Sequence, residues 1–241
     1  MVYGACMALV LLVEDDHVVR AAMAGALRDA GHVVQPVGTA VDALGAVTKD
    51  QVDLVVLDLG LPDFNGYETM QMLRGINKVL PVIIATARTD EPTIVRLLNE
   101  GADDYITKPF SSEVLNARVG AVLRRAESAV PAEDEPLRVG PLVIDPARRE
   151  VTLDGTPLTL TRLEFDLLAY LAARCEKVVS KAELAGGVWH QAGLHLEQTI
   201  DVHLSLLRRK LGETAANPRF LHTVRGVGVK LVDPCGTSSS A

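Results

Sequence analysis

Side chains able to do chemistry follow short apolar runs at four places in the first half of the chain. They are Glu14 and Asp15, then Asp58, then Thr86, then Lys108. Crowded carboxylates repel one another, and a hard cation such as Mg²⁺, which prefers oxygen ligands, relieves that repulsion. An aspartate is ionised at neutral pH and needs no general base, so its obstacle is the approach to an anionic phosphoryl donor. A metal ion and a lysine offset that obstacle, so these residue types suit phosphoryl transfer to an aspartate.

These side chains can act together only if the fold brings them to one place. Apolar segments typical of buried strands recur at residues 9–13, 33–37, 54–57, 82–85 and 105–107. Stretches with helical spacing lie between them, and glycines at positions that commonly end a helix follow residues 18–30 and 94–100. The alternation predicts an α/β doubly wound domain with a five-stranded parallel sheet. Ligands bind at the carboxyl ends of the strands in such a sheet, so the polar residues are expected on one rim.

The pattern changes beyond residue 125, which divides the chain of 241 residues into two predicted domains. Residues 126–136, AESAVPAEDEP, lack periodicity and are typical of a linker. Short alternating strands, three helical segments and a final ribbon that turns at Arg225 and Gly226 then predict an α+β domain. The predicted order is a first domain over 1–125, the linker, a second domain over 137–233 and a flexible tail over 234–241.

The net charge of −7 is unevenly distributed along the chain. Residues 1–125 carry 11 Lys and Arg against 16 Asp and Glu, whereas residues 137–241 carry 13 against 11. Within the second half, residues 203–230 contain six Lys and Arg and only one acid, Glu213. A local basic cluster of this kind is compatible with nucleic-acid binding despite the acidic total.

Several classes of protein are disfavoured by the sequence. The first apolar run, residues 9–13, is too short to span a membrane and lacks the basic flank of a signal peptide, so no membrane partner is expected. The three cysteines are far apart and odd in number, which favours neither a disulfide framework nor a zinc site. We therefore expect a protein of the reducing cytoplasm.

Four motifs of the first half resemble the receiver domain of bacterial response regulators. They are VLLVEDD, VVLDLGLPDFNG, IIATA and ADDYITKPF, and the resemblance covers about the first 125 residues. It implies that Asp58 accepts a phosphoryl group from a sensor histidine kinase and that Glu14 and Asp15 hold Mg²⁺ together with it. It further implies that Thr86 and Lys108 hold the phosphoryl group.

Two other receiver positions follow from the same resemblance. Tyr105 is expected to be the aromatic ring that rotates on activation, with Thr86 as its switch partner. Gly60 would offer only its backbone carbonyl to the metal ion, whereas many relatives carry a side chain there that affects the lifetime of the phosphoryl group. The sequence therefore does not predict that lifetime.

The second half resembles the winged helix-turn-helix of OmpR/PhoB-type regulators, on the motifs LTRLEFDLLAYLA, TIDVHLSLLRRKLG and FLHTVRGVGVKL. Independently, Ile200, Leu204, Leu207 and Leu211 share one helical stripe suited to a core, which leaves another, partly basic face for a DNA major groove. Arg225 at the ribbon turn could enter a minor groove. The residues expected to contact DNA are Thr199, Val202, His203, Leu206, Arg208, Arg209, Lys210, Thr223 and Arg225.

Two departures from the family bear on DNA preference. Leu206 stands where the family often has an arginine that can reach bases, and it could offer only apolar contact, for example to thymine methyl groups. Val229 replaces a frequent tyrosine in the wing. The operator preference is therefore expected to be specific to a subgroup of the family.

The resemblance also implies that activation produces a symmetric dimer, which binds direct repeats in promoters and acts on RNA polymerase. The dimer would form through the fourth helix, fifth strand and fifth helix. Its expected contacts are Ile94, Asp103, Asp104, Val114, Arg118 and Arg125. Because Ile94 and Val114 replace a charged pair that is usual there, dimerisation is expected to be less sensitive to salt than in relatives.

Two alternatives remain open from the sequence. A nucleophilic aspartate on a doubly wound domain also suits phosphatases of the haloacid dehalogenase type, but these need a second acid at the position of Gly60, so we expect no enzyme. The other alternative is a DNA-binding regulator whose receiver is only a dimerisation module and does not depend on phosphorylation. The complete acidic pocket argues against this second alternative.

Overall fold

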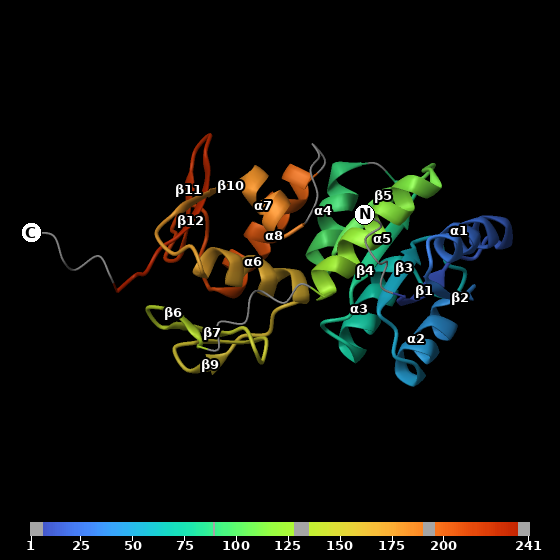
Figure 1. Ribbon diagram of the computed structural model, residues 1–241, viewed down its shortest axis with the longest axis horizontal. Helices are drawn as coiled ribbons and strands as arrows, with labels where there is room; N and C mark the ends of the chain where they lie inside the picture. Colours follow the sequence, from blue (N-terminus) through green and yellow to red (C-terminus); the bar gives the residue numbers. More distant parts are fainter. Residues whose placement is uncertain (1–6, 89, 128–134, 190–195, 236–241) are drawn as a thin grey trace, which may run out of the picture. The chain divides into compact units, whose positions relative to one another are not determined.

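The structure, a computed structural model, describes residues 7–88, 90–127, 135–189 and 196–235. It divides into two compact units, residues 1–126 and 127–241, which are drawn in Figure 1 and described separately below. Most of the predicted linker and of the predicted tail lies outside the described residues.

The first unit is an α/β domain in which strands and helices alternate (Figure 1). All of the strands are parallel, in the order β2-β1-β3-β4-β5, as the doubly wound prediction requires. The strands are β1 (Leu9–Val13), β2 (Val33–Val37), β3 (Leu54–Asp58), β4 (Val82–Thr86) and β5 (Asp104–Thr107). The helices are α1 (His17–Asp29), α2 (Ala40–Lys49), α3 (Gly66–Ile76), α4 (Glu91–Asn99) and α5 (Ser112–Glu127).

The core of this unit follows from the alternation of side chains along each strand. Val10, Leu12 and other residues of one sheet face pack in a single cluster with apolar residues of α1 and α5. On the opposite face, strand residues such as Leu11 and Val55 are fully buried, and the remaining helices α2, α3 and α4 supply buried residues. Both faces of the parallel sheet are therefore covered, which agrees with its uninterrupted apolar strands.

Helix ends fall where local chemistry permits them. Gly31 and Gly101 have positive φ angles of 92° and 100°, which confirms their expected role just past the ends of α1 and α4. α4 begins three residues before the predicted Ile94, because Asp90 caps it and Pro92 occupies its first turn.

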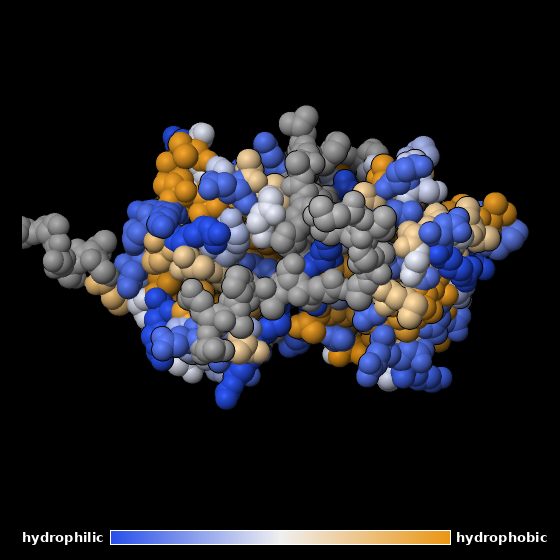
Figure 2. All heavy atoms as spheres, viewed as in Figure 1, coloured by the Kyte–Doolittle hydropathy of each residue, from blue (hydrophilic) through white to orange (hydrophobic). Residues whose placement is uncertain are grey.

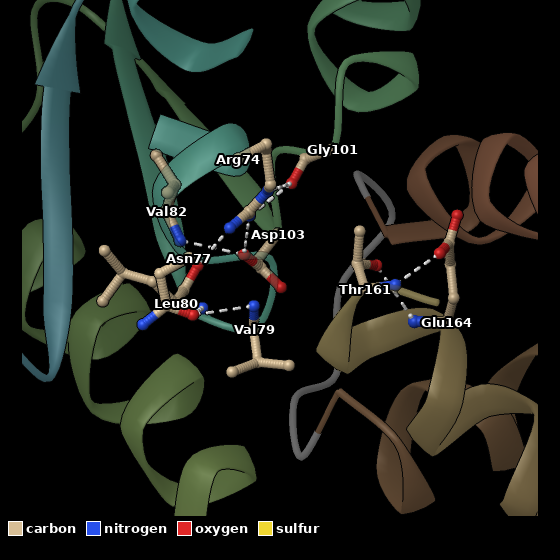
Figure 3. Close-up of polar contacts among 9 residues, drawn as sticks. All are labelled: Arg74, Asn77, Val79, Leu80, Val82, Gly101, Asp103, Thr161 and Glu164. Carbon is tan, nitrogen blue, oxygen red and sulfur yellow. Dashed lines mark hydrogen bonds and ion pairs between the residues drawn. The ribbon is translucent and has the colours of Figure 1, made fainter. Parts of the chain in front are cut away.

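A network of hydrogen bonds centred on Arg74 joins α3 to the start of β4 and the loop before β5 (Figure 3). The guanidinium donates to the carbonyl oxygen of Gly101 at 2.6 Å, to Asp103 at 2.9 Å and to the carbonyl oxygen of Leu80. Asp103 also accepts the Val82 amide at 2.8 Å. The pair is largely buried, with side-chain exposures of 12% and 5%. Removing either partner would leave the other charge buried.

The second unit is an α+β domain built from a four-stranded sheet, a helical core and a three-stranded sheet (Figure 1). Its first sheet contains β6 (Leu137–Val139), β7 (Leu142–Asp145), β8 (Glu150–Leu153) and β9 (Thr156–Pro157). The helices are α6 (Arg162–Ala172), α7 (Lys181–Gly187) and α8 (Leu196–Lys210). The last sheet contains β10 (Val178–Ser180), β11 (Leu221–Val224) and β12 (Gly228–Leu231).

Turn and cap residues behave in this unit as their types require. Asp154 and Gly155 form the hairpin turn between the paired strands β8 and β9, with φ angles of 50° and 77°. Thr161 and Glu164 form a capping box at the start of α6 (Figure 3). Gly228 approaches β10 so closely that an added Cβ would lie 2.0 Å from the carbonyl oxygen of Val179. Only glycine fits at this position, which lies directly after the turn of the β11–β12 ribbon.

We predict that Arg74→Met lowers the free energy of unfolding of the first unit by about 2–4 kcal/mol, because it removes a cation from the buried Asp103 carboxylate and the donors to the carbonyl oxygens of Leu80 and Gly101. Urea unfolding followed by circular dichroism checks this. Trp189, the single tryptophan of the chain, lies in the second unit, so its fluorescence transition should not move. Lys78 is an exposed cation in the turn that follows α3, and Lys78→Met is the control. It should change the free energy of unfolding by less than about 0.5 kcal/mol. Equal stability of both variants would contradict the prediction.

Candidate functional site

Three carboxylates meet at the carboxyl ends of two neighbouring strands. β1 pairs with β3 so that Val13 lies opposite Leu57, which places Glu14 and Asp15 beside Asp58. The oxygen atoms that these three acids can offer to a metal ion lie within 4.8 Å of one another. Glu14 and Asp58 are buried, whereas Asp15 is exposed. Such a set of oxygen ligands, open on one side, suits a hard divalent cation.

Lys108 neutralises part of this charge. Its Nζ lies 2.6 Å from Oε2 of Glu14 and 3.1 Å from Oδ1 of Asp58. Burial by itself would lower the pKa of Lys108, but the hydrogen bond to Glu14 and the charges of Asp58 and Glu14 outweigh it and raise this pKa. Burial raises the pKa of Glu14, and the Asp58 charge adds to this, although the bond from Lys108 acts the other way. Lys108 is therefore a firmly charged cation among crowded acids.

Thr86 and Tyr105 lie on the next two strands. Thr86 ends β4 and is buried; its Oγ1 accepts the Arg88 amide at 3.0 Å, and its carbonyl oxygen accepts the Lys108 amide at 2.7 Å. Tyr105 lies one strand further, on the edge strand β5, and is 8% exposed. Burial raises the pKa of its phenol, and the nearby Asp104 charge adds to this. The polar residues that the sequence predicts at the carboxyl ends of the strands therefore lie on the same rim of the sheet. They are Glu14, Asp15, Asp58, Thr86 and Lys108.

Gly60 lies directly beside the candidate acceptor. A Cβ added to it would be 3.2 Å from Oδ2 of Asp58, so even a small side chain would press on that carboxylate. The absence of a side chain therefore leaves one side of Asp58 open to a ligand.

Two residues that shape this site were missed by the sequence analysis. Arg20 of α1 donates to the backbone carbonyl oxygens of Glu14 and Asp15, at 2.9 Å for the latter, and so fixes the loop that carries both acids. Asp63, which lies in the loop after Asp58, accepts the backbone amides of Ala40 and Val41 at the beginning of α2. Arg20 lies outside the quoted motifs, and Asp63 lies within VVLDLGLPDFNG, where the sequence analysis gave it no role. The available signal was a cation one helical turn into α1 and an acid after Pro62.

Asp16, which the motif VLLVEDD includes, is not part of the acid cluster among the described residues. Its side chain caps α1 by accepting the amides of Val18 and Val19 at 2.8 and 3.0 Å. These hydrogen bonds lower the pKa of Asp16. Asp16 therefore serves as the N-cap of the first helix.

The candidate DNA-binding residues lie on α8 and on the β11–β12 ribbon. The core prediction for α8 is confirmed, since its predicted stripe packs in the core of the second unit with Trp189. Arg209, Thr223 and Arg225 are exposed, and Lys210 is partly exposed. Figure 2 shows hydrophilic and hydrophobic atoms together at the ribbon tip, where Val227 is 57% exposed. The remaining candidates are buried in this structure, and they are Thr199, Val202, His203, Leu206 and Arg208.

Two of the residues expected to contact DNA, Arg208 and Lys210, have partners inside the second unit. Arg208 of α8 donates to the carbonyl oxygen of Leu221 at 3.2 Å and to Oγ1 of Thr223 at 2.9 Å, both on β11. Burial lowers the pKa of its guanidinium, in opposition to the charge of Glu213. Lys210 forms an ion pair with buried Glu164 of α6. Arg208 therefore joins α8 to the ribbon, in addition to any contact with DNA.

The ring of His203 lies against the ring of Trp189, with centroids 5.9 Å apart. Val202 and Leu206 are 8% and 3% exposed, and neither belongs to the core cluster of the second unit. Contact of these two residues with bases stays a prediction.

The candidate dimer residues have contacts within one chain. Arg118 donates to both carboxylate oxygens of Asp104 at 2.9 Å, and Asp103 is bound by Arg74 as described above. Ile94 is 6% exposed, whereas Val114 is 43% exposed. The side chain of Arg125 lies outside what the structure describes. The expected pairing across a dimer therefore stays a prediction.

The first unit combines a parallel α/β fold with three acids and a lysine at the carboxyl ends of its strands, which defines a receiver domain. The second unit is a winged helix, which defines a DNA-binding domain. Residues 10–120 match the family model of the response regulator receiver domain, and residues 155–231 match that of the transcriptional regulatory protein C terminal. No helix among the described residues is long and apolar enough to cross a membrane.

The chain is 41% identical to the sensory transduction protein RegX3 of Mycolicibacterium smegmatis, over 93% of this chain and 99% of that protein. It is 40% identical to the transcriptional regulatory protein PrrA of Mycobacterium tuberculosis, over 92% and 95%. The solved structure of DrrB, an OmpR/PhoB homologue of Thermotoga maritima, matches with a TM-score of 0.52 and 29% identity over 94% of this chain and 99% of that one. The chain belongs to the OmpR/PhoB-type response regulators of two-component systems, a family of transcription regulators.

We predict that Arg208→Met and Arg209→Met have different effects. Loss of Arg208 leaves the Leu221 carbonyl without its side-chain donor, so the second unit should lose about 1–3 kcal/mol of stability in Trp189 fluorescence unfolding. Loss of exposed Arg209 should leave stability unchanged but weaken binding to all duplexes alike. The slope of the logarithm of the DNA-binding constant against the logarithm of the salt concentration should decrease in magnitude by about one. Loss of sequence preference without loss of stability in Arg208→Met would contradict the structural role.

Proposed function

We propose that Asp58 accepts a phosphoryl group from a sensor histidine kinase in the cytoplasm, and that this modification raises the affinity of the chain for promoter DNA. The observation that carries the proposal is the position of the Asp58 carboxylate, which lies within 4.8 Å of ligand oxygens of Glu14 and Asp15 and 3.1 Å from Nζ of Lys108. Asp58 ends a central strand of the sheet, so the incoming group meets both the acids and the lysine.

Glu14, Asp15, Asp58 and the backbone carbonyl of Gly60 are the groups that would hold Mg²⁺. The donor set fits this ion, because all are oxygen ligands and Gly60 has no side chain to fill the space beside Asp58. When bound, the ion would supply positive charge for the oxygens of the phosphoryl group.

The protein side chains account for the remaining chemistry. An oxygen of Asp58 attacks phosphorus of the phosphohistidine, a P–O bond forms, the P–N bond breaks, and its electron pair stays on the histidine nitrogen. The Lys108 ammonium would then exchange its contact with Glu14 for a contact with a negatively charged phosphoryl oxygen. The Thr86 hydroxyl, at the end of the neighbouring strand, would donate to another. Movement of Thr86 would give Tyr105 room to change position.

Consequences outside the site follow from the family. Phosphorylation would favour a symmetric dimer through α4, β5 and α5, and the dimer would place two copies of the second unit on direct repeats near RNA polymerase. Exposed Arg209 and Arg225 support this part of the proposal, because they can reach a phosphate backbone and a minor groove.

We expect Asp58→Asn to abolish labelling by a phosphorylated kinase or acetyl phosphate and to remove the gain in DNA affinity, because the amide cannot attack phosphorus. Asp29→Asn, at an exposed acid at the end of α1, is the matched control and should behave as the parent. Labelling is measured with radioactive donor, and DNA affinity by titration with and without beryllofluoride. Equal labelling of Asp58→Asn would overturn the assignment. Equal DNA affinity of the parent with and without beryllofluoride would favour a regulator independent of phosphorylation.

Lys108→Met should separate metal binding from signalling. Without Nζ beside Glu14 and Asp58 the site is more negative, so Mg²⁺ should bind about three- to tenfold more tightly in calorimetry. The gain in DNA affinity on phosphorylation should fall, because the phosphoryl group loses its cation. Lys49→Met, at an exposed cation on α2, is the control. Weaker Mg²⁺ binding in Lys108→Met would show that Lys108 organises the acids instead of competing for them.

A further inference from the structure

The loop of residues 59–65, which follows Asp58, is fixed at both ends. Gly66 donates its amide to the carbonyl oxygen of Leu59 at 3.3 Å, and a Cβ on Gly66 would lie 2.2 Å from Cδ2 of Leu59. Asn65 begins α3 in a capping box with Glu68. The two ends of the loop therefore close on each other.

The middle of the loop is exposed and depends on other anchors. Pro62, Asp63 and Phe64 are exposed, and Leu61 contributes a buried side chain. Asp63 reaches the beginning of another helix, where Oδ1 accepts the Ala40 amide at 3.0 Å and Oδ2 accepts the Val41 amide at 2.9 Å. This carboxylate is thus the polar tether between the acceptor loop and α2.

α2 does not depend on Asp63 alone. Oγ1 of Thr39 caps the same helix by accepting the Asp42 amide at 3.1 Å and donates to the Asp42 carboxylate at 2.7 Å. Thr39 and Asp63 therefore satisfy different amides of one helix end. They differ in one respect, because Thr39 belongs to α2's own chain segment, whereas Asp63 connects the helix to the loop after Asp58.

Gly60 makes the tether important in this chain. Glycine has more backbone freedom than any other residue, and no side chain holds this position. Gly60 nevertheless lies beside the Asp58 carboxylate, with its hypothetical Cβ 3.2 Å from Oδ2. The direction of its carbonyl is therefore set by what holds the rest of the loop.

We infer that Asp63 is a positioning residue, which holds the acceptor loop against α2 so that the Gly60 carbonyl and the Asp58 carboxylate are placed in advance for a divalent cation. The inference rests on the proposed function of this rim. Two charge-assisted bonds at a helix N-terminus are a firm connection, since amides and macrodipole both favour a carboxylate there. Desolvation by itself would raise the pKa of Asp63, but the backbone amides of Ala40, Val41, Asp63 and Phe64 together outweigh it and lower this pKa, so the tether is ionised at neutral pH.

The test compares Mg²⁺ binding by the full-length parent and by Asp63→Ala, Asp63→Asn and Thr39→Ala, in calorimetry without any phosphoryl donor. Asp63→Ala should raise the Mg²⁺ dissociation constant by about three- to tenfold, because the loop must be ordered at the expense of binding. Asp63→Asn keeps one acceptor oxygen and should show a smaller rise. Thr39→Ala weakens the same helix end without releasing the loop, so its dissociation constant should equal that of the parent.

Amide hydrogen exchange is the second readout, and it should become faster over residues 59–66 in Asp63→Ala but not in Thr39→Ala. An unchanged dissociation constant in Asp63→Ala, or the same rise in Thr39→Ala, would overturn the inference and leave the acceptor role of Asp58 standing. Failure of the parent itself to bind Mg²⁺ would overturn both. The two failures are thus distinguished by whether the parent or only the variant departs from expectation.

Discussion

The balance of charge at the carboxyl edge of the parallel sheet is the constraint on which the first unit depends. Glu14 and Asp58 are acids that the fold buries, and Lys108 contacts both. Isolated buried charges are costly, and a shared cation offsets much of that cost. One lysine cannot neutralise three carboxylates, and the pKa of Glu14 remains raised, first by burial and then by the charge of Asp58. The site is therefore stable enough to fold yet still favours the arrival of further positive charge.

The surrounding structure holds these charges through the backbone. Arg20 binds the carbonyl oxygens of the loop that carries Glu14 and Asp15, and Asp63 ties the loop after Asp58 to α2. Parallel register then sets the lateral spacing, because neighbouring strands end either level with each other or one residue apart. The acids can thus repel one another without spreading apart. Preorganisation of this kind is what allows a small change of charge to be felt by neighbouring strands.

Patterns of neighbouring residues predicted the fold well, whereas contacts between distant segments could not be predicted. Buried parallel strands are runs of apolar residues, so all five were found, and with them the rim that carries Asp58. The core stripe of α8 was found for the same reason. Burial of Arg208 was not found, because a long cation next to a basic cluster has the same local pattern whether it faces DNA or β11. Asp63 was missed because its partners are 22 and 23 residues away.

The buried guanidinium of Arg208 has a consequence for how a regulator of this kind can evolve. It joins the second half of α8 to β11 and so restrains the helix and the ribbon against each other. For any duplex that touches both elements, the number of base pairs between the two contacted segments is then fixed. New target sequences can arise by exchange of exposed residues at either end, one surface at a time. A change of spacing requires that the joint itself be rebuilt, which is a much rarer event than a single substitution.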